Sequence, residues 1–396
     1  MLVQKYRDML TQKSVIRQLS EFAAARGKEI GYENVFDYSL GNPSVPVPRE
    51  FTDTMIHMLT TRESNELHGY SPNLGITSVR EAIAASLEKR FGLPYRKEHI
   101  FMASGAAGAL AHAFRLVTEP GDEILTFAPF FPEYHPYVDL TGAVLKVVPP
   151  DTESFQINFE SFEEMLTEKV MAVLINSPNN PSGVVYSGTT LEKLADTLKR
   201  KSQEYGHDIF LISDEPYREI VFDGAEAPCV SRFYDNTIMC YSFSKSLSLP
   251  GERIGYVAVN PRCKYAEEMV YMCVQISRGT GHNCPPSIIQ LAVAQVLDKT
   301  ADVSVYETNR NLIYHELVDL GFTCVKPGGT FYIFPKALEE DAKIFCEKAL
   351  KYDLILVPGD TFGAPGYFRM AYCIDTEKVE RSLEALRRFV KEEYGR

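Results

Sequence analysis

Short apolar segments alternate with amphipathic segments along the middle of the chain, from about residue 76 to residue 260. The amphipathic segments, 76–92, 108–122 and 190–206, have helical periodicity and end at glycine or Pro-Gly. The apolar segments lack the polar alternation of a half-exposed strand, so they predict strands buried on both faces. Together they predict an α/β fold with a mostly parallel sheet. The predicted strands are HIFMAS (99–104), EILTFAP (123–129), AVLINSP (172–178), IFLISDEP (209–216), TIMCYSFS (237–244) and IGYVAVNP (254–261).

The pattern changes after about residue 285. PPSIIQLAVAQVLDKT (285–300) predicts part of a long helix, and EKVERSLEALRRFVKEEY (377–394) predicts an amphipathic one. The apolar segments between them indicate a smaller α+β unit. The first forty-odd residues lack a strand set of their own, so we expect them to pack on that unit. The predicted large domain is therefore 46–290, and the predicted small domain is 1–45 plus 291–396.

Composition excludes several classes of protein. The 396 residues carry a net charge of −12, which argues against nucleic acid as a main partner. The eight cysteines are scattered without a Cys-x-x-Cys pair, so we expect reduced thiols and no metal site. No signal-peptide core or membrane-length apolar run occurs. The expected protein is cytoplasmic and bound to no membrane.

Polar residues follow the predicted strands, where an α/β sheet binds its ligands. The segments are SGAAG (104–108), NSPNNPSG (176–183), SDEPYRE (213–219) and SFSKSLSLPGERIGY (242–256). Taken singly, a tight turn explains the first, and a helix cap or an ion pair explains Asp214. Taken together, they offer a phosphate-sized turn, an amide, a carboxylate and a lysine among hydroxyls. Pyridoxal 5'-phosphate uses all of these groups, so we expect it as the cofactor.

The order of the motifs carries a family resemblance. With LGNP (40–43), HGYSPNLG (68–75) and YFRMAY (367–372), the chain resembles fold-type I pyridoxal-phosphate enzymes of the aspartate aminotransferase family, class I/II. The resemblance implies a seven-stranded sheet flanked by helices, and a smaller domain formed by both chain ends. It also implies a homodimer with shared active sites.

The same resemblance implies roles for individual residues. Lys245 would bond the cofactor aldehyde and later move the substrate proton, and Asp214 would keep the ring nitrogen protonated. Asn180 and Tyr217 would donate to the phenolate oxygen. Arg369 would clamp the substrate α-carboxylate, near the backbone of Gly41.

Other residues would hold the rest of the cofactor. Phe131 would stack on its ring, and Tyr70 would reach the phosphate of the neighbouring subunit. The residues expected at the phosphate within one subunit are Ser242, Ser244 and Arg253, with the backbone of Gly105, Ala106 and Ala107.

Two departures bear on the substrate. Phe131 occupies the position at which many dicarboxylate-specific members of the family carry tryptophan. Ala107 occupies the position at which some members carry a lysine that points to the second, distal carboxylate of the substrate. Arg278 lies near the position at which another branch of the family carries an arginine that binds this distal carboxylate from the neighbouring subunit. The simpler interpretation of Arg278 is an arginine on a surface loop. The resemblance implies an aminotransferase with a ping-pong mechanism, and we expect aspartate and 2-oxoglutarate as its substrates.

Several alternatives stay open at this stage. A C–S β-lyase, or an aminotransferase for alanine, aromatic or other amino acids, would use the same residues. SFSK (242–245) is formally Ser-x-x-Lys, although the Ser-Asp-Asn and Lys-Thr-Gly partners of an acyl-serine hydrolase are missing. A regulatory protein without catalytic activity is a further alternative, but it would not explain why every expected catalytic position carries the residue that catalysis requires.

Overall fold

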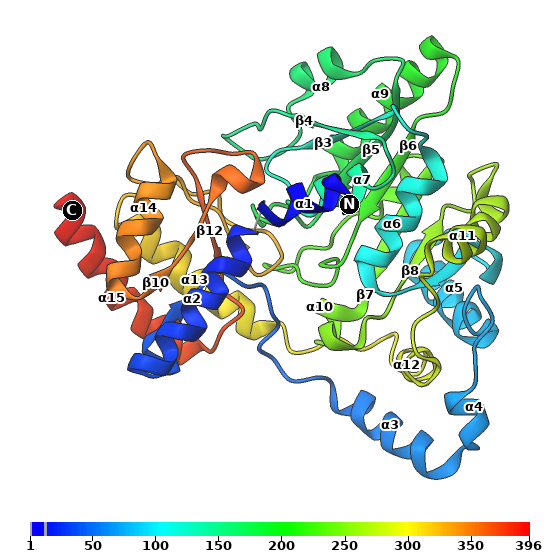
Figure 1. The fold of residues 1–396 in the computed structure, drawn as a ribbon, viewed down its shortest axis with the longest axis horizontal. Coiled ribbons are helices and arrows are strands. Elements are labelled where there is room, and N and C mark those ends of the chain that lie inside the picture. Colours follow the sequence, from blue (N-terminus) through cyan, green and yellow to red (C-terminus); the bar gives the residue numbers. More distant parts are fainter. Residues whose placement is uncertain (1, 12–13) are drawn as a thin grey trace.

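A seven-stranded sheet forms the centre of the larger part of the protein (Figure 1). The computed structural model describes residues 2–11 and 14–396; Met1, Gln12 and Lys13 lie outside the described residues. The strand order is β2-β8-β7-β6-β5-β3-β4, and β8 runs antiparallel to both of its neighbours while the others are parallel. The predicted mostly parallel α/β sheet is confirmed. The strands are β2 (Ile100–Ala103), β3 (Glu123–Phe127), β4 (Val144–Val148), β5 (Val170–Asn176), β6 (Phe210–Asp214), β7 (Thr237–Ser242) and β8 (Gly255–Val259).

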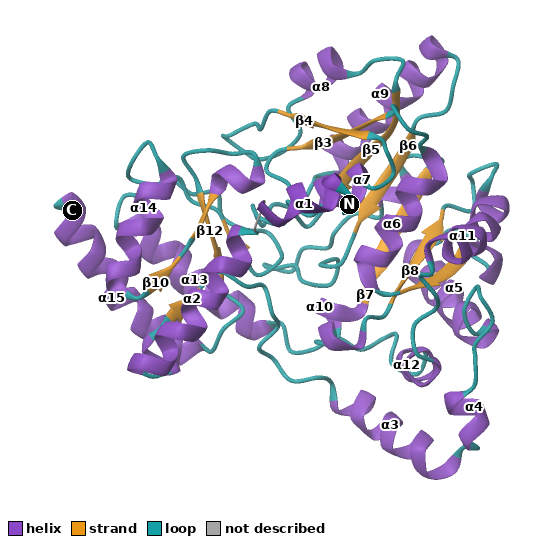
Figure 2. Cartoon of the chain, viewed as in Figure 1, coloured by secondary structure: helices purple, strands orange, loops and turns teal. Residues whose placement is uncertain are grey.

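Helices cover both faces of this sheet (Figure 2). Successive residues of one strand point to opposite faces, so Ile124 packs with α6 and α11 in one core, whereas Leu125 packs with α8 and α9 in the other. This two-sided burial is why the strands are almost continuously apolar. The helices around the sheet are α5 (Thr77–Phe91), α6 (Gly105–Val117), α7 (Tyr134–Asp139), α8 (Phe159–Met165), α9 (Gly188–Tyr205) and α11 (Ala266–Thr280).

The C-terminal part forms a second unit with its own core. Strands β11, β12 and β9 make a small antiparallel sheet, and β1 from the N-terminal part pairs in parallel with β10. Phe36 and Tyr38 pack in one cluster with residues of α13, α14 and α15. The elements are α2 (Val15–Ile30), β1 (Phe36–Asp37), α13 (Ser304–Asp319), β9 (Tyr332–Ile333), α14 (Ala342–Ala349), β10 (Leu354–Ile355), β11 (Val357–Pro358), β12 (Phe368–Ala371) and α15 (Thr376–Tyr394).

The long helix predicted around 285–300 is wrong. Helix α12 spans only Ser287–Val293, and the chain then turns. Val296 stays fully buried against the large core, so the apolar pattern continues although the helix does not. The backbone N–H of Ala301 then donates to Ser246 O at 2.7 Å, which holds the chain against the short helical turn that carries Lys245.

The remaining helices are short or lie outside the two cores that contain Ile124 and Leu125. Figure 1 shows α3 (Arg49–Thr61) and α4 (Ser64–His68) at the lower edge of the molecule, beside α12, and α1 (Gln4–Thr11) near α7. The short α10 (Phe243–Ser246) follows β7 and carries Lys245. In the described ranges, no helix is both long and apolar enough to cross a membrane. The same ranges hold no cluster of His, Cys, Asp and Glu side chains that could bind a metal ion.

Gly255 lets β8 approach the start of α6 closely. A Cβ atom there would lie 2.2 Å from Tyr241 O and 3.0 Å from Gly105 Cα. We expect Gly255→Ala to lower the free energy of unfolding by about 1–3 kcal/mol, because backbone would have to move. Gly251→Ala is the matched control in urea unfolding, because a Cβ atom at Gly251, in the turn before β8, would have no atom within 4 Å. Equal stability of the two variants would contradict this packing.

Candidate active site

One cavity of about 290 Å³ gathers most of the predicted site residues. It lies at the carboxyl ends of β5, β6 and β7, beside the start of α6 and the C-terminal unit. Gly105 adjoins this cavity, whereas Tyr70 is fully exposed and Arg278 is exposed on α11. The predicted residues that line it are Gly41, Ala106, Ala107, Phe131, Asn180, Asp214, Tyr217, Ser242, Ser244, Lys245, Arg253 and Arg369.

Lys245 offers an amine with a lowered pKa. Its Nζ donates to Gly41 O at 2.7 Å and lies 5.4 Å from the centre of the Phe331 ring. Burial lowers the pKa of Lys245 to about 8, and the charges of Arg253 and Arg369 act in the same direction. A substantial fraction of this amine is therefore neutral near physiological pH, unlike that of an exposed lysine.

Asp214 presents a buried carboxylate with one free oxygen. Its Oδ2 accepts a hydrogen bond of 2.6 Å from the hydroxyl of Tyr134. Its Oδ1 is buried and has no hydrogen-bond partner among the described residues. Burial raises the pKa of Asp214 to about 7, whereas the Tyr134 hydrogen bond opposes this rise.

Arg369, in β12, also lines the cavity and has almost no exposed surface. Its Nη1 donates to Asn180 Oδ1 at 3.0 Å and its Nη2 to Ser39 O. The buried Nε has no partner among the described residues. The guanidinium also lies 4.6 Å from the centre of the Tyr332 ring. It thus keeps a free donor for an anionic ligand such as a carboxylate.

The start of α6 and the side chain of Arg253 form one end of the cavity. Gly105 has a φ of +72°, and Arg253, itself at a φ of +52°, folds back over it. The Arg253 Nη1 and Nη2 donate to Pro250 O at 3.1 Å and Ser104 O at 3.5 Å. Backbone N–H groups and the helix dipole make such a helix start suitable for phosphate.

Ser242 belongs to this end of the cavity. Its Oγ donates to Ser244 Oγ at 2.8 Å, whereas the amine of Lys245 donates to Gly41 O. No hydrogen bond joins either serine hydroxyl to Lys245 Nζ in the part of the chain that the structure describes. The Ser-x-x-Lys alternative therefore lacks the contact that would activate a serine.

Three residues that sequence reasoning missed support the site. Tyr134 binds Asp214, and Asn176 donates to Asp214 O at 2.9 Å while accepting from the Asn180 N–H at 2.7 Å. The hydroxyls of Tyr332 and Tyr217 lie 3.1 Å apart. Asn176 ends β5, so its position at a strand end was a usable signal. The sequence gives no comparable signal for Tyr134 or Tyr332.

These residues fit pyridoxal phosphate. The free Oδ1 of Asp214 suits a protonated ring nitrogen, the Lys245 amine suits an aldehyde, and the Gly105 turn with Arg253 suits a phosphate. The side chain of Phe131 is available to cover the ring. The free Arg369 Nε is left for a substrate carboxylate.

The raised pKa of Asp214 gives a pH-dependence prediction. In the cofactor-free protein the folded state holds a proton that the unfolded chain releases near pH 4. Its contribution to stability is therefore fully present below that pH and is lost as the pH rises through about 7. From pH 5 to pH 8, the wild type should lose on the order of 2 kcal/mol relative to Asp214→Asn. Urea unfolding measures this, and parallel pH curves for the two proteins would contradict the assignment.

Comparisons with known proteins agree with this geometry. The family model for aminotransferase class I and II matches residues 33–386. An aspartate aminotransferase of Thermotoga maritima is 30% identical, over 95% of this chain and 99% of its own length. An aromatic-amino-acid aminotransferase of Thermococcus litoralis is also 30% identical, over 97% of each chain.

A solved structure gives the same result for the fold. The crystal structure of an amino transferase from Eubacterium rectale is 44% identical to this chain. It superposes with a TM-score of 0.96, and the match covers 100% of both chains. Since the family match spans most of the sequence and the cavity carries the groups that the cofactor needs, the chain belongs to the class I and II aminotransferases, which are pyridoxal-phosphate-dependent transaminases of fold type I.

Proposed function

We propose that this aminotransferase moves an amino group between an L-amino acid and a 2-oxo acid in two half-reactions at this cavity. One observation carries the proposal: the Lys245 amine shares the cavity with two buried groups that keep free hydrogen-bonding atoms, Asp214 Oδ1 and Arg369 Nε. Burying a polar atom without a hydrogen-bond partner costs free energy. This supports the presence of a bound ligand that forms hydrogen bonds with both atoms.

Each residue has a distinct task in this proposal. When bound, pyridoxal phosphate supplies an aldehyde that takes up the amino group and a ring that withdraws electrons from the substrate carbon. Arg369 binds the substrate α-carboxylate through its free Nε, which fixes the orientation of the reacting carbon. Lys245, with a pKa of about 8, accepts and returns the proton at that carbon near neutral pH. Asp214 holds the ring nitrogen protonated, and Asn180 and Tyr217 donate to the phenolate oxygen.

Aspartate and 2-oxoglutarate are the proposed substrates. The relative from Thermotoga maritima carries the name aspartate aminotransferase and supports this choice, whereas the Thermococcus litoralis name points to aromatic substrates. Among the described residues, the cations lining the cavity are Lys245, Arg253 and Arg369. A second substrate carboxylate therefore needs a further cation, for which we propose Arg278 of a neighbouring subunit.

A homodimer follows from the same proposal. Tyr70 is an exposed aromatic residue on the loop after α4, and Arg278 is exposed on α11, where its Nη1 donates to Gln275 Oε1 at 2.8 Å. We propose that both residues contribute to the cavity of a second copy of the chain. We also propose that the protein acts in the cytoplasm.

Lys245→Ala tests the central task. We expect cofactor to bind without a covalent link and transamination to fall by at least about 100-fold, because the proton-transfer group is gone. Borohydride treatment followed by peptide mass analysis should fix the cofactor on Lys245 in the wild type only. Lys169→Ala, an exposed lysine, is the control and should retain activity. Near-wild-type turnover of Lys245→Ala would overturn the proposal.

Arg278→Ala tests the substrate. If Arg278 binds the distal carboxylate, the preference for aspartate over alanine in kcat/KM should fall about tenfold or more, since a charged hydrogen bond is lost. Arg262→Ala, another partly exposed arginine, should leave the preference unchanged. An unaltered preference in Arg278→Ala would remove Arg278 from the dicarboxylate site.

A further inference from the structure

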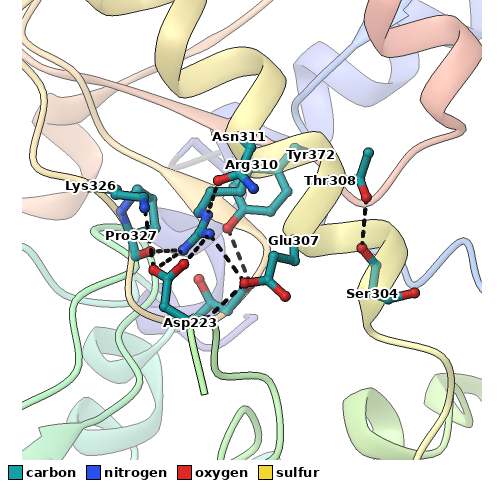
Figure 3. A network of polar contacts seen from close by, with 10 residues as sticks. Asp223, Ser304, Glu307, Thr308, Arg310, Asn311, Lys326, Pro327 and Tyr372 are labelled. Carbon is teal, nitrogen blue, oxygen red and sulfur yellow. Dashed lines mark hydrogen bonds and ion pairs between the residues drawn. The ribbon is translucent and has the colours of Figure 1, made fainter. Parts of the chain in front are cut away.

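One completely buried arginine is not among the residues that line the cavity. Arg310, in α13, has no exposed side-chain surface. Its Nη1 donates to Asp223 Oδ2 and to Pro327 O, each at 3.0 Å (Figure 3). Its Nη2 donates to Asp223 Oδ1 at 3.1 Å and to Glu307 Oε1 at 3.4 Å. Its Nε donates to Asn311 Oδ1 at 3.1 Å, so every guanidinium nitrogen is used.

The two segments that Arg310 binds pair with each other. Val221 and Gly329 form an antiparallel bridge. The Phe222 N–H donates to Gly328 O at 3.0 Å, and the Thr330 N–H donates to Ile220 O at 2.9 Å. We call the paired segments 217–223 and 327–332 the tyrosine junction. Arg310 holds one segment at Asp223 and the other at Pro327.

Both segments of the tyrosine junction lead into the cavity. The first begins at Tyr217 and the second ends at Tyr332, and their hydroxyls lie 3.1 Å apart. The N–H groups of Gly328 and Gly329 both donate to Gly183 O at 2.9 Å, in the loop that carries Asn180. The segments bearing Tyr217, Tyr332 and Asn180 are therefore joined at one place.

Asp223 is held in a conformation that needs support. Its φ is +58°, which is strained for a residue with a side chain. Its N–H donates to Glu307 Oε1 at 2.9 Å, and its carboxylate accepts both bonds from Arg310. Two side chains of α13, Arg310 and Glu307, thus bind Asp223. Lys326, the residue just before the second segment, adds an ion pair of 3.3 Å between its Nζ and Asp223 Oδ2.

We propose that Arg310 is a positioning residue for the cofactor. By clamping Asp223 and Pro327 it fixes the spacing of the Tyr217 and Tyr332 hydroxyls, and so aims the Tyr217 hydroxyl at the cofactor phenolate oxygen. This inference rests on the proposed role of Tyr217. A merely structural arginine would stabilise the fold without coupling to that hydroxyl.

A double-mutant cycle distinguishes the two roles. Arg310→Met should raise the dissociation constant for pyridoxal phosphate at least about threefold, measured by equilibrium dialysis. In a Tyr217→Phe background the same change should have less effect, because the hydroxyl that Arg310 aims is absent. Arg310→Lys keeps the charge but not the fork, and should fall between the wild type and Arg310→Met.

The matched control is Arg387→Met. Arg387, in α15, pairs bidentately with Glu316 of α13, the helix that also carries Arg310. This pair lies away from the tyrosine junction, so loss of Arg387 should leave cofactor affinity unchanged. If Arg310→Met does not fold, Asp223→Asn, at a half-exposed side chain, carries the same prediction.

Two results would overturn the inference. If Tyr217→Phe weakens cofactor binding but Arg310→Met changes it equally with and without the Tyr217 hydroxyl, Arg310 is only structural. If Tyr217→Phe itself leaves cofactor affinity unchanged, the proposed role of Tyr217 is wrong, and the inference about Arg310 falls with it. The cycle therefore separates failure of the positioning role from failure of the site.

Discussion

The burial of incompletely hydrogen-bonded charged groups is the constraint on which the site depends. Asp214 Oδ1 and Arg369 Nε are both buried without a partner among the described residues. An unsatisfied buried polar group costs about 1–3 kcal/mol, and more when it is charged. A bound molecule that accepts from one and donates to the other removes this cost. The same burial lowers the pKa of Lys245 and raises that of Asp214.

The cavity depends on contacts between the two halves of the structure. Arg369 belongs to the C-terminal unit but donates to Asn180, which follows β5 of the large sheet. Lys245 follows β7 of that sheet but donates to Gly41 from the N-terminal part. Segments far apart in the sequence therefore define each end of the site. Movement of one half against the other would change the distances on which proton transfer and carboxylate binding depend.

Much of the fold and of the cavity could be predicted from the sequence, because one rule links them. Residues at the carboxyl ends of apolar strands meet at one edge, which brought together Asp214, Lys245 and the turn at Gly105. Tyr134 and Tyr332 escaped prediction because their contacts depend on tertiary packing rather than strand position. The helix expected at 285–300 was wrong because buried residues of an irregular turn show the same apolar pattern. The role of Arg278 stays a prediction.

The most direct test of the account is the visible absorption spectrum of the purified protein loaded with pyridoxal phosphate, before and after L-aspartate alone. If Lys245 binds the cofactor and aspartate is the amino donor, the visible band should disappear in favour of near-ultraviolet absorption, and 2-oxoglutarate should restore it. A band that ignores aspartate but responds to another amino acid would contradict the proposed substrate. No visible band, even with added cofactor, would contradict the assignment of Lys245 itself.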